Sequence, residues 1–302
     1  MSTPYHVAVI GLGAMGMGAA RSCLRAGLTT YGIDLNEEAR NQLQQAGATA
    51  VMADARPLAE TLDAVLLLVV NAVQVRRILL GDEGLARHLK PGTAIMVSST
   101  IAAEEASALA AELALMGLPM LDAPVSGGAI KADAGEMTVM AAGSDAAFDK
   151  LAPVLDAVAG KVYRVGSEPG QGSTVKIIHQ LLAGVHIAVA AEAMALASRA
   201  GVSLDLMYDV VTHAAGNSWM FENRMPRVLA GDYQARSAVD IFVKDLTLVA
   251  DTAKALRFPL PLASTALNMF LGASNAGHGQ EDDSAVIKIF SGIQLPGQEE
   301  LL

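Results

Sequence analysis

The chain has 302 residues, of which 52% are hydrophobic and 17% charged, and its formal net charge is −10. This acidic balance disfavours nucleic acid and anionic membrane surfaces as partners. Its single cysteine, Cys23, excludes a disulfide within the chain and suits a reducing cytoplasm. We expect Cys23 to be a small buried helix residue, not a nucleophile, and the length to support one large core or two ordinary ones.

The N-terminal segment carries the pattern of a dinucleotide-binding unit. A short apolar run at residues 6–10 precedes a glycine-rich stretch, a helical pattern and a second strand that ends at Asp34. The glycine-rich stretch reads Gly11-Leu12-Gly13-Ala14-Met15-Gly16. In this context the first glycine permits a tight turn, the second lets the backbone approach a pyrophosphate, and the third allows close helix–strand packing.

The acid at the end of the second strand predicts which cofactor binds. A carboxylate at Asp34 accepts hydrogen bonds from both hydroxyls of an adenosine ribose and repels a 2′-phosphate. Leu35 and Asn36 follow it, so no arginine stands directly behind the strand. We therefore predict NAD and not NADP; a glycine-rich turn beside a surface aspartate is the alternative interpretation.

Strands and helices keep alternating as far as residue 166. We predict strands at residues 63–70, 93–97, 119–122, 136–143 and 162–165, helices at 102–116 and 145–158, and a polar loop at 122–135. Asn71 and Thr100 each follow a strand, where a parallel sheet meets its cofactor. We expect both near the nicotinamide, and Thr100 also fits the N-cap of the next helix.

The predicted loop contains Ser126, Gly127 and Gly128. A hydroxyl next to backbone N–H groups without obstructing side chains is suited to hold a small carboxylate. The same residues also make a common flexible turn. The spacing alone leaves both interpretations open.

Helical patterns replace the strands after residue 167. We predict helices at residues 173–200, 204–215, 220–229, 238–256, 261–276 and 282–291. The first is apolar all round, and because His186 and Glu192 interrupt it we expect a buried interface helix and not a membrane span. The predicted fold is an α/β, Rossmann-type doubly wound domain, residues 1–167, followed by an all-α domain, residues 168–302, joined by this helix.

Lys176 lies near the start of the long helix, and Gln180 follows one turn later on the same face. An ammonium group there must be solvated, paired or used in chemistry. A lysine that snorkels at a helix end fits the periodicity as well as a catalytic lysine does. The histidines lack metal-ligand spacing with carboxylates, so we predict no metal, and we expect Trp219 in the core.

Four blocks together resemble the β-hydroxyacid dehydrogenase family, which includes 3-hydroxyisobutyrate dehydrogenase. They occur in the family's order and span almost the whole chain. The blocks are Gly11-Leu12-Gly13-Ala14-Met15-Gly16, Asp122-Ala123-Pro124-Val125-Ser126-Gly127-Gly128, Gly172-Ser173-Thr174-Val175-Lys176 and Lys244-Asp245-Leu246. The resemblance implies an NAD-dependent oxidoreductase that acts on a small hydroxy-carboxylate, and a homodimer or homotetramer joined through the helical half.

The resemblance also implies roles for individual residues. Lys176 matches the family's catalytic acid/base, which must be neutral to act as a base; burial and the nearby Lys244 would both lower its pKa. Ser126, with Gly127 and Gly128, matches the loop that binds the substrate carboxylate. Lys244 matches a lysine that closes over cofactor and substrate, while Asn71 and Thr100 match positions near the nicotinamide ribose.

One departure from the family pattern bears on the substrate. The family usually has asparagine one turn after the catalytic lysine, where this chain has Gln180. Lys-Ile-Ile-His-Gln resembles a subgroup that oxidises the 2-hydroxyl of L-threonate, a four-carbon sugar acid, to 2-oxo-tetronate. Extra hydroxyls need extra partners, and the candidates are His179, Asn217, Ser218 and Asn223.

Other activities remain open at the level of sequence. The chain also fits a 3-hydroxyisobutyrate-type enzyme, or a glyoxylate, succinic semialdehyde or tartronate semialdehyde reductase. Asp34 disfavours the NADPH preference expected of the reductases. Outside enzymes, an NAD-binding sensor or structural subunit is the alternative, although Lys176 and the Ser126 loop argue against lost chemistry.

Overall fold

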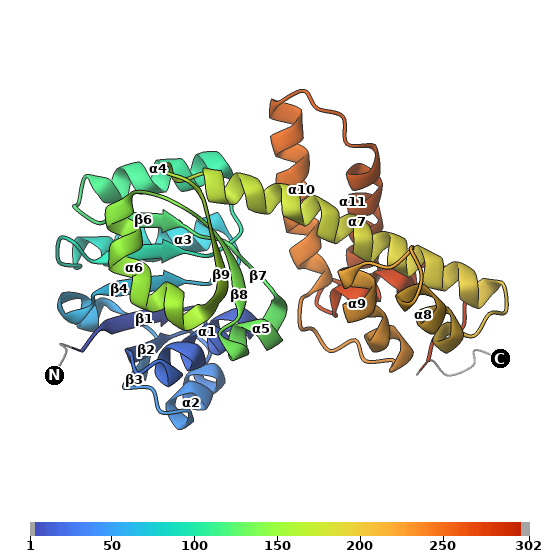
Figure 1. Ribbon diagram of the computed structural model, residues 1–302, viewed down its shortest axis with the longest axis horizontal. Coiled ribbons are helices and arrows are strands. Elements are labelled where there is room, and N and C mark those ends of the chain that lie inside the picture. Colours follow the sequence, from blue (N-terminus) through green and yellow to red (C-terminus); the bar gives the residue numbers. More distant parts are fainter. Residues whose placement is uncertain (1–3, 297–302) are drawn as a thin grey trace. The chain divides into compact units, whose positions relative to one another are not determined.

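The computed structural model describes residues 4–296 and divides into two compact units, Met1–Lys176 and Ile177–Leu302 (Figure 1). The first unit combines a mostly parallel sheet with helices, and the second is helical. The predicted fold class is therefore confirmed. The proposed domain boundary between residues 167 and 168 stays a prediction.

The first unit is built on one sheet, which has nine strands within residues 4–296, in the order β3-β2-β1-β4-β5-β6-β8-β7, with β9 paired to β8. The strands are β1 His6–Ile10, β2 Thr29–Ile33, β3 Ala50–Met52, β4 Ala64–Leu67, β5 Ala94–Val97, β6 Met120–Asp122, β7 Val125–Ser126, β8 Met137–Ala142 and β9 Ala159–Gly166. The first six run parallel, and β8 is antiparallel to β6. The winding direction reverses between β1 and β4, the place where such sheets bind ligands.

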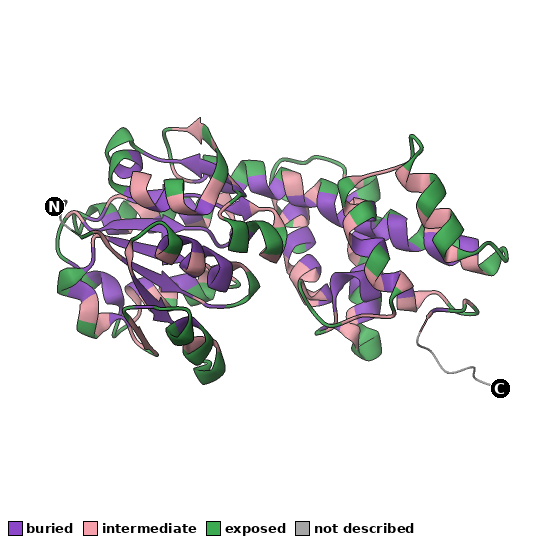
Figure 2. Cartoon of the chain, turned by 60° about the horizontal axis from the view of Figure 1, so that its bottom comes forward, coloured by how far each residue is buried: buried purple, intermediate pink, exposed green. Residues whose placement is uncertain are grey.

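Apolar cores lie on both faces of this sheet. Val7 and Val9 of β1 belong to one core, and Ala8 and Ile10 belong to the other. Because both faces are covered, β1, β4 and β5 are apolar runs without alternation, and Figure 2 shows the middle of the sheet mostly buried. Strands β3 and β9 are less buried. The covering helices are α1 Ala14–Arg25, α2 Glu37–Gln45, α3 Ala72–Leu80, α4 Ala103–Ala114, α5 Gly128–Ala134 and α6 Asp145–Val158, with 3-10 turns at Arg56–Thr61 and Leu85–Arg87.

Two predictions for the first unit are wrong. Residues 122–135 contain strand β7 and helix α5, because an alanine-rich segment favours a helix that Gly135 ends with a left-handed φ of 73°. Thr100 is not an N-cap, since α4 starts at Ala103 and Ala102 precedes it. The chain first buries Ile101, at 1% exposure, and only then turns into the helix. The sequence patterns also missed β3, α2 and α3.

The second unit is organised around α7, Gln171–Arg199, which begins in the first unit. It continues with α8 Leu204–Thr212, α9 Trp219–Leu229, α10 Val239–Ala255 and α11 Pro261–Ala273, then a π-helical turn at Ser274–His278 and a 3-10 helix at Asp283–Ile289. The α-helix predicted at 282–291 is wrong. There the Asp283 amide donates to Ser237, and the Asp282 carboxylate accepts from Ser284, so these bonds replace an α-helical pattern.

Burial of α7 is one-sided. Its inner face, with Ile187, Ala191 and Met194, is buried in the core of the second unit. Gly184 lets α10 approach closely, because a Cβ there would lie 2.8 Å from the Leu246 side chain. Among the described residues α7 is, by length and composition, long and apolar enough to cross a membrane, and half of its most apolar window is buried within the structure.

Burial was predicted for two single residues, Trp219 and Cys23, with different outcomes. Trp219 does not lie in the core: it begins α9 and is 51% exposed. Its place in the first turn, directly after the cap residue Ser218, points it away from the apolar face of the helix that Phe221 and Met225 bury. Cys23, in contrast, is fully buried in α1 as predicted.

Cys23 should be inert toward thiol reagents in the folded protein. Burial raises the pKa of its thiol to about 12, so the reactive thiolate is scarce at neutral pH, and the sulfur is shielded as well. We expect no modification by 5,5′-dithiobis(2-nitrobenzoate) in native buffer and one equivalent in guanidinium chloride. Fast modification of the native protein at pH 7 would contradict this placement.

Candidate active site

The glycine-rich turn between β1 and α1 shows which glycines the fold requires. Gly11 has φ +91°, and a Cβ at Gly16 would lie 1.7 Å from the Gly11 carbonyl oxygen. Gly13 is different: its backbone is extended, with φ −67° and ψ −168°, and a Cβ there would meet nothing within 4 Å. The fold does not need a glycine at position 13, whereas a pyrophosphate lying against the backbone does.

The glycine-rich turn at residues 11–16 forms what we call the dinucleotide cradle. The first turn of α1 adds hydrogen-bond donors to it. Gly13 is the N-cap and makes no side-chain cap bond, so the N–H groups of the turn that begins with Ala14 and Met15 are not capped by a side chain. Helix N-termini of this kind bind phosphate through backbone N–H groups and the helix dipole. The residues present therefore fit a dinucleotide.

Asp34 lies beside this turn. Its Oδ2 accepts a hydrogen bond of 2.6 Å from the amide of Leu12, and its Oδ1 accepts one of 2.8 Å from Asn36. The carboxylate is thus fixed at the carboxyl ends of β1 and β2, as a ribose-binding acid requires. Sequence reasoning missed Arg40, whose guanidinium donates to the carbonyl oxygens of Asp34 and Leu35.

Asn71 and Thr100, both predicted near the nicotinamide, follow the carboxyl ends of β4 and β5. Asn71 is the N-cap of α3, where its Oδ1 accepts from the Gln74 amide at 2.9 Å. Thr100 lies just beyond the end of β5 and is partly exposed. Directly before it, the hydroxyl oxygens of Ser98 and Ser99 are buried without a hydrogen-bond partner in the described part of the chain. Buried polar groups normally have partners, so these two hydroxyls are candidates for ligand contacts that sequence reasoning did not single out.

The Ser126 loop follows a backbone path that needs glycine. Ser126 ends β7, and Gly127 and Gly128 follow with φ values of +135° and +71°. Side chains rarely adopt these conformations, and a Cβ at Gly127 would also contact the Lys131 side chain at 2.8 Å. The glycines are therefore required by the backbone path.

Asp122 ties this loop to the start of α7. Its fully buried carboxylate accepts from the amides of Gly170 and Ser173, both at 2.8 Å, and from the Ser173 hydroxyl at 2.7 Å. Burial raises the pKa of Asp122, and the bonds from Ser173 and Gly170 oppose that rise. Lys176, 6% exposed, follows Ser173 by three residues, so Asp122 fixes the helical turn that carries Lys176.

Asp122→Asn should disturb both folding and turnover. The amide oxygen can still accept from the Gly170 and Ser173 amides, but these bonds lose the help of the negative charge, and the NH2 group now faces the Ser173 hydroxyl, which loses its acceptor. We expect a cost of about 1–3 kcal/mol in unfolding free energy. We expect a fall in kcat of about tenfold or more with a smaller change in the Kd for NADH. Urea unfolding and steady-state kinetics measure the two effects. Asp149→Asn, on the exposed face of α6, is the control and should change neither, and an unchanged kcat in Asp122→Asn would contradict the positioning role.

In the second unit the structure brings together Lys244, Gln180 and His179 through a residue that sequence reasoning had not assigned a role. Asp245, 2% exposed, accepts from Gln180 Nε2 at 2.5 Å and forms an ion pair with Lys244 Nζ at 2.6 Å. Gln180 Oε1 lies 2.9 Å from His179 Nδ1. The Lys244-Asp245-Leu246 block was the available signal, since it placed a carboxylate next to the lysine.

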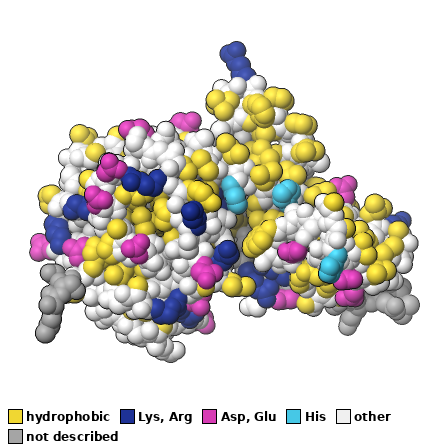
Figure 3. Space-filling model, in the orientation of Figure 1, with side chains coloured by type: hydrophobic (Ala, Val, Ile, Leu, Met, Phe, Trp, Pro, Cys, Tyr) yellow, Lys and Arg dark blue, Asp and Glu magenta, His cyan; other side chains and the backbone are white. Residues whose placement is uncertain are grey.

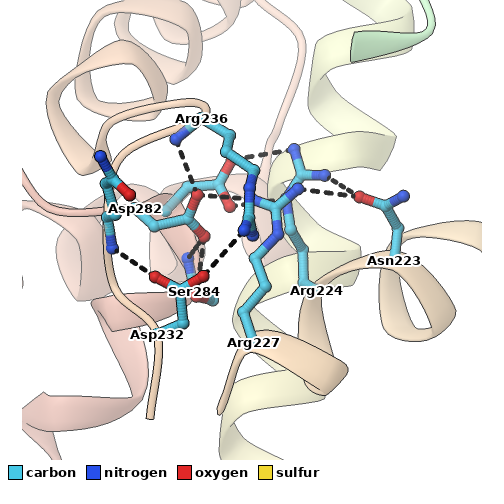
Figure 4. Close-up of polar contacts among 9 residues, drawn as sticks. Asn223, Arg224, Arg227, Asp232, Arg236, Asp282 and Ser284 are labelled. Carbon is cyan, nitrogen blue, oxygen red and sulfur yellow. Dashed lines mark hydrogen bonds and ion pairs between the residues drawn. The ribbon is translucent and has the colours of Figure 1, made fainter. Parts of the chain in front are cut away.

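The other polar candidates of this unit are used in the fold. Asn217 Nδ2 donates to Glu222 at 2.7 Å, although its Oδ1 is buried without a hydrogen-bond partner in the described residues. Ser218 is the N-cap of α9. Asn223 Oδ1 accepts from Arg224 and Arg227 (Figure 4). As a substrate ligand, Asn223 is therefore disfavoured.

Figure 4 shows the cluster to which Asn223 belongs. Arg224 makes a two-point contact with Asp283 at 2.6 and 3.0 Å, and Arg227 pairs with Asp282 at 2.5 Å. Both carboxylates are fully buried, and the cluster joins α9 to the segment that follows α11. Such pairs are structural in effect, because removing one partner leaves a buried charge.

Within residues 4–296 there is no group of three or more His, Cys, Asp or Glu side chains that could hold a metal ion. The groups available for chemistry are the dinucleotide cradle, the Ser126 loop and the lysines. A Rossmann-type unit with such a cradle, followed by an all-helical unit, is the arrangement expected of a nicotinamide-dependent dehydrogenase.

Comparison with known proteins gives the family. Residues 6–166 match the NAD-binding domain of 6-phosphogluconate dehydrogenase, and residues 170–290 match the NAD-binding domain of NADP-dependent 3-hydroxyisobutyrate dehydrogenase. L-threonate dehydrogenase of Escherichia coli O6:H1 is 73% identical over 97% of both chains, and that of Cupriavidus necator is 56% identical over 98% of this chain and 99% of its own. A crystal structure of 3-hydroxyisobutyrate dehydrogenase from Salmonella typhimurium is 70% identical, with a TM-score of 0.92 over 95% of this chain and 100% of that one.

The chain belongs to the 3-hydroxyisobutyrate dehydrogenase family of nicotinamide-dependent hydroxyacid dehydrogenases. The predicted resemblance, the oxidoreductase class and the nicotinamide cofactor are thereby confirmed. The roles of individual residues stay predictions.

Proposed function

We propose that this protein oxidises the 2-hydroxyl of L-threonate to 2-oxo-tetronate with NAD+. The observation that carries the proposal is the high identity to relatives named L-threonate dehydrogenase, from 56% to 73% over at least 97% of this chain. The Gln180 departure from the usual family pattern points to the same substrate.

The proposed roles follow from the chemistry of each group. Bound NAD+ supplies the hydride acceptor. Lys176 removes the proton of the reacting hydroxyl, and the hydroxyl and N–H groups of Ser126, Gly127 and Gly128 hold the substrate carboxylate. Lys244 adds positive charge toward cofactor and substrate, and His179 and Asn217 are the candidates for the remaining hydroxyls. Gln180 was also predicted to bind the substrate, but both ends of its amide contact Asp245 and His179.

The preference for NAD over NADP rests on Asp34. Its carboxylate is anchored at the carboxyl ends of β1 and β2, where we expect it to accept hydrogen bonds from the ribose hydroxyls and to repel a 2′-phosphate. Arg40 of α2 donates to two carbonyl oxygens, so part of its hydrogen-bonding capacity is already used within the fold. For the cofactor cradle we propose Gly11, Leu12, Gly13, Ala14, Met15 and Gly16, with Asn71 and Thr100 near the nicotinamide ribose.

A substrate panel tests the proposal. NADH or NADPH formation at 340 nm is followed with L-threonate, D-threonate, D-erythronate, D-glycerate and 3-hydroxyisobutyrate, each with NAD+ and with NADP+. We expect the highest kcat/KM for L-threonate with NAD+. A higher value for another acid, or for NADP+, would contradict the corresponding part of the proposal.

3-Hydroxyisobutyrate is the second candidate substrate, because the Salmonella typhimurium structure at 70% identity carries that enzyme's name. The same panel separates the two, since 3-hydroxyisobutyrate has its hydroxyl on C3 and lacks the hydroxyls of a sugar acid. Semialdehyde reduction and a non-enzymatic role have less support, because the relatives at 56% and 73% identity are both named dehydrogenases.

We further propose a cytoplasmic homodimer or homotetramer that associates through the helical unit. Ile178, Leu182, Val189 and Leu196 are 53–66% exposed and lie within about 40° of one another around α7. This α7 stripe is about 27 Å long, and Figure 3 shows hydrophobic side chains gathered over the helical unit. A stripe with near-heptad spacing suits packing against a helix of a second copy.

Charge placed on the α7 stripe should dissociate the oligomer. We expect Leu182→Glu/Val189→Glu to run as a monomer in size-exclusion chromatography with light scattering, while the unmodified chain is a dimer or tetramer. Leu115→Glu is the control, because Leu115 is 90% exposed and lies in the first unit. A monomeric unmodified chain would contradict the proposal, as would an unchanged oligomer in the double variant.

A further inference from the structure

Four side chains of the second unit form one continuous line of polar contacts. Lys244 Nζ lies 2.6 Å from Asp245 Oδ1, Asp245 Oδ2 accepts from Gln180 Nε2 at 2.5 Å, and Gln180 Oε1 lies 2.9 Å from His179 Nδ1. Asp245 and Gln180 are 2% and 6% exposed, and His179 at the end of the line is partly exposed. The line joins α7 to α10.

Lys244 and Asp245 form an ion pair without hydrogen-bond geometry, and the chemistry of the groups fixes the direction of the other two contacts, which are hydrogen bonds. An ionised carboxylate only accepts, so Asp245 requires the NH2 end of the Gln180 amide. The amide oxygen must then face His179, and because that oxygen only accepts, His179 must carry its proton on Nδ1. In the neutral ring, Nε2 is consequently an acceptor.

We propose that His179 selects the substrate by accepting a hydrogen bond, through Nε2, from a hydroxyl beyond the reacting carbon. This inference rests on the proposed function. His179 and Lys176 are three residues apart in α7, so their side chains neighbour each other on one helix face. A four-carbon sugar acid held at Lys176 by its 2-hydroxyl extends its remaining hydroxyls over this face. Gln180 and Asp245 act as positioning residues that set the His179 tautomer.

The tautomer is testable without measuring activity. In protein labelled with 15N-histidine, correlations from the ring carbon-bound protons to the two nitrogens show which nitrogen is protonated; His179→Gln identifies the signal among the six histidines. We expect His179 to be protonated on Nδ1 and not on Nε2 at neutral pH. Gln180→Met removes the acceptor and should shift the ring toward the Nε2–H form. Protonation on Nε2 in the unmodified protein would overturn the inference.

Two matched variants test the selectivity. His179→Asn keeps a donor near the Nδ1 position and removes the Nε2 acceptor, whereas His179→Gln keeps an acceptor near Nε2. The substrates are L-threonate and 2-hydroxybutyrate of the same C2 configuration, which lacks the distal hydroxyls; if the latter is not oxidised, its competitive inhibition constant replaces kcat/KM. We expect His179→Asn to lose about 10- to 100-fold in kcat/KM for L-threonate only, and His179→Gln to recover part of it.

The outcomes separate this inference from the proposed function. Oxidation of L-threonate by the unmodified protein with an equal loss for both substrates in His179→Asn overturns the inference alone, because it shows a general structural effect. No oxidation of L-threonate by the unmodified protein overturns the proposed function and this inference with it.

Discussion

Replacing Lys176 with methionine is expected to lower kcat for hydroxy-acid oxidation by about 10²–10⁴-fold, the usual contribution of a general acid–base group. Methionine keeps the length and apolar stem of a side chain that is only 6% exposed, so the local packing should survive. The Kd for NADH, measured by fluorescence titration, should stay within about twofold, because the cradle at Gly13 lies elsewhere in the first unit.

Lys161→Met is the matched control, since Lys161 is an exposed lysine of β9 in the same unit. It should leave both kcat and the Kd for NADH near their original values. Near-native turnover in Lys176→Met would show that Lys176 is a structural lysine. A parallel loss of NADH affinity would point to a role in binding the cofactor and not in proton transfer.

The second large effect is expected from a pair of alanine substitutions in the glycine-rich turn. Gly13→Ala should weaken NADH binding by about tenfold or more, because its methyl group enters the space next to the backbone where the pyrophosphate lies. It should leave the thermal midpoint almost unchanged, since the backbone there is extended and a Cβ meets no protein atom within 4 Å.

Gly16→Ala, in contrast, should destabilise the fold. Its methyl group would lie 1.7 Å from the Gly11 carbonyl oxygen, so the turn must open, with a cost of about 1–3 kcal/mol in unfolding free energy as for other overpacked sites. Urea unfolding and NADH titration measure both variants. If Gly13→Ala destabilises the fold while binding NADH normally, position 13 serves the fold and not a ligand.

Much of the first unit was predictable because its signals are local. Apolar runs such as residues 6–10 are read directly, since parallel strands are buried on both faces, and the turn glycines mark where the runs end. The predictions were wrong where a tertiary contact decided the local structure. Threonine is a common N-cap residue, so Thr100 was a reasonable prediction. However, Ile101 is buried first, and α4 begins only at Ala103.

The candidate residues were accessible from sequence to the extent that they lie in recognisable blocks. Lys176 and Ser126 belong to such blocks, and Asp34 follows the glycine-rich block at the expected spacing. The blocks do not show which of their residues bond to one another: Ser173 donates to Asp122, 51 residues away. The bond from Gln180 to Asp245 joins residues 65 apart. No periodicity shows pairs at that separation, so Asp245 was part of a recognised block without a role.

Trp219 shows that residue type alone can also mislead a prediction of burial. A lone tryptophan in an apolar chain is usually buried, but this one begins α9 and is 51% exposed. The residues of α9 that pack in the core include Phe221 and Met225, and Trp219 lies on another side of the helix. The residue type alone was therefore a poor guide to the burial of this side chain.

The central claim, oxidation at C2 of L-threonate, is tested most directly by following the transferred hydride. L-threonate carrying deuterium at C2 is incubated with NAD+ and the protein, and the reduced cofactor is analysed by mass spectrometry. Our account predicts reduced cofactor that is one mass unit heavier than NADH and formed in equal amount to 2-oxo-tetronate. Unlabelled NADH from this substrate, together with labelled cofactor from L-threonate deuterated at C3, would contradict it.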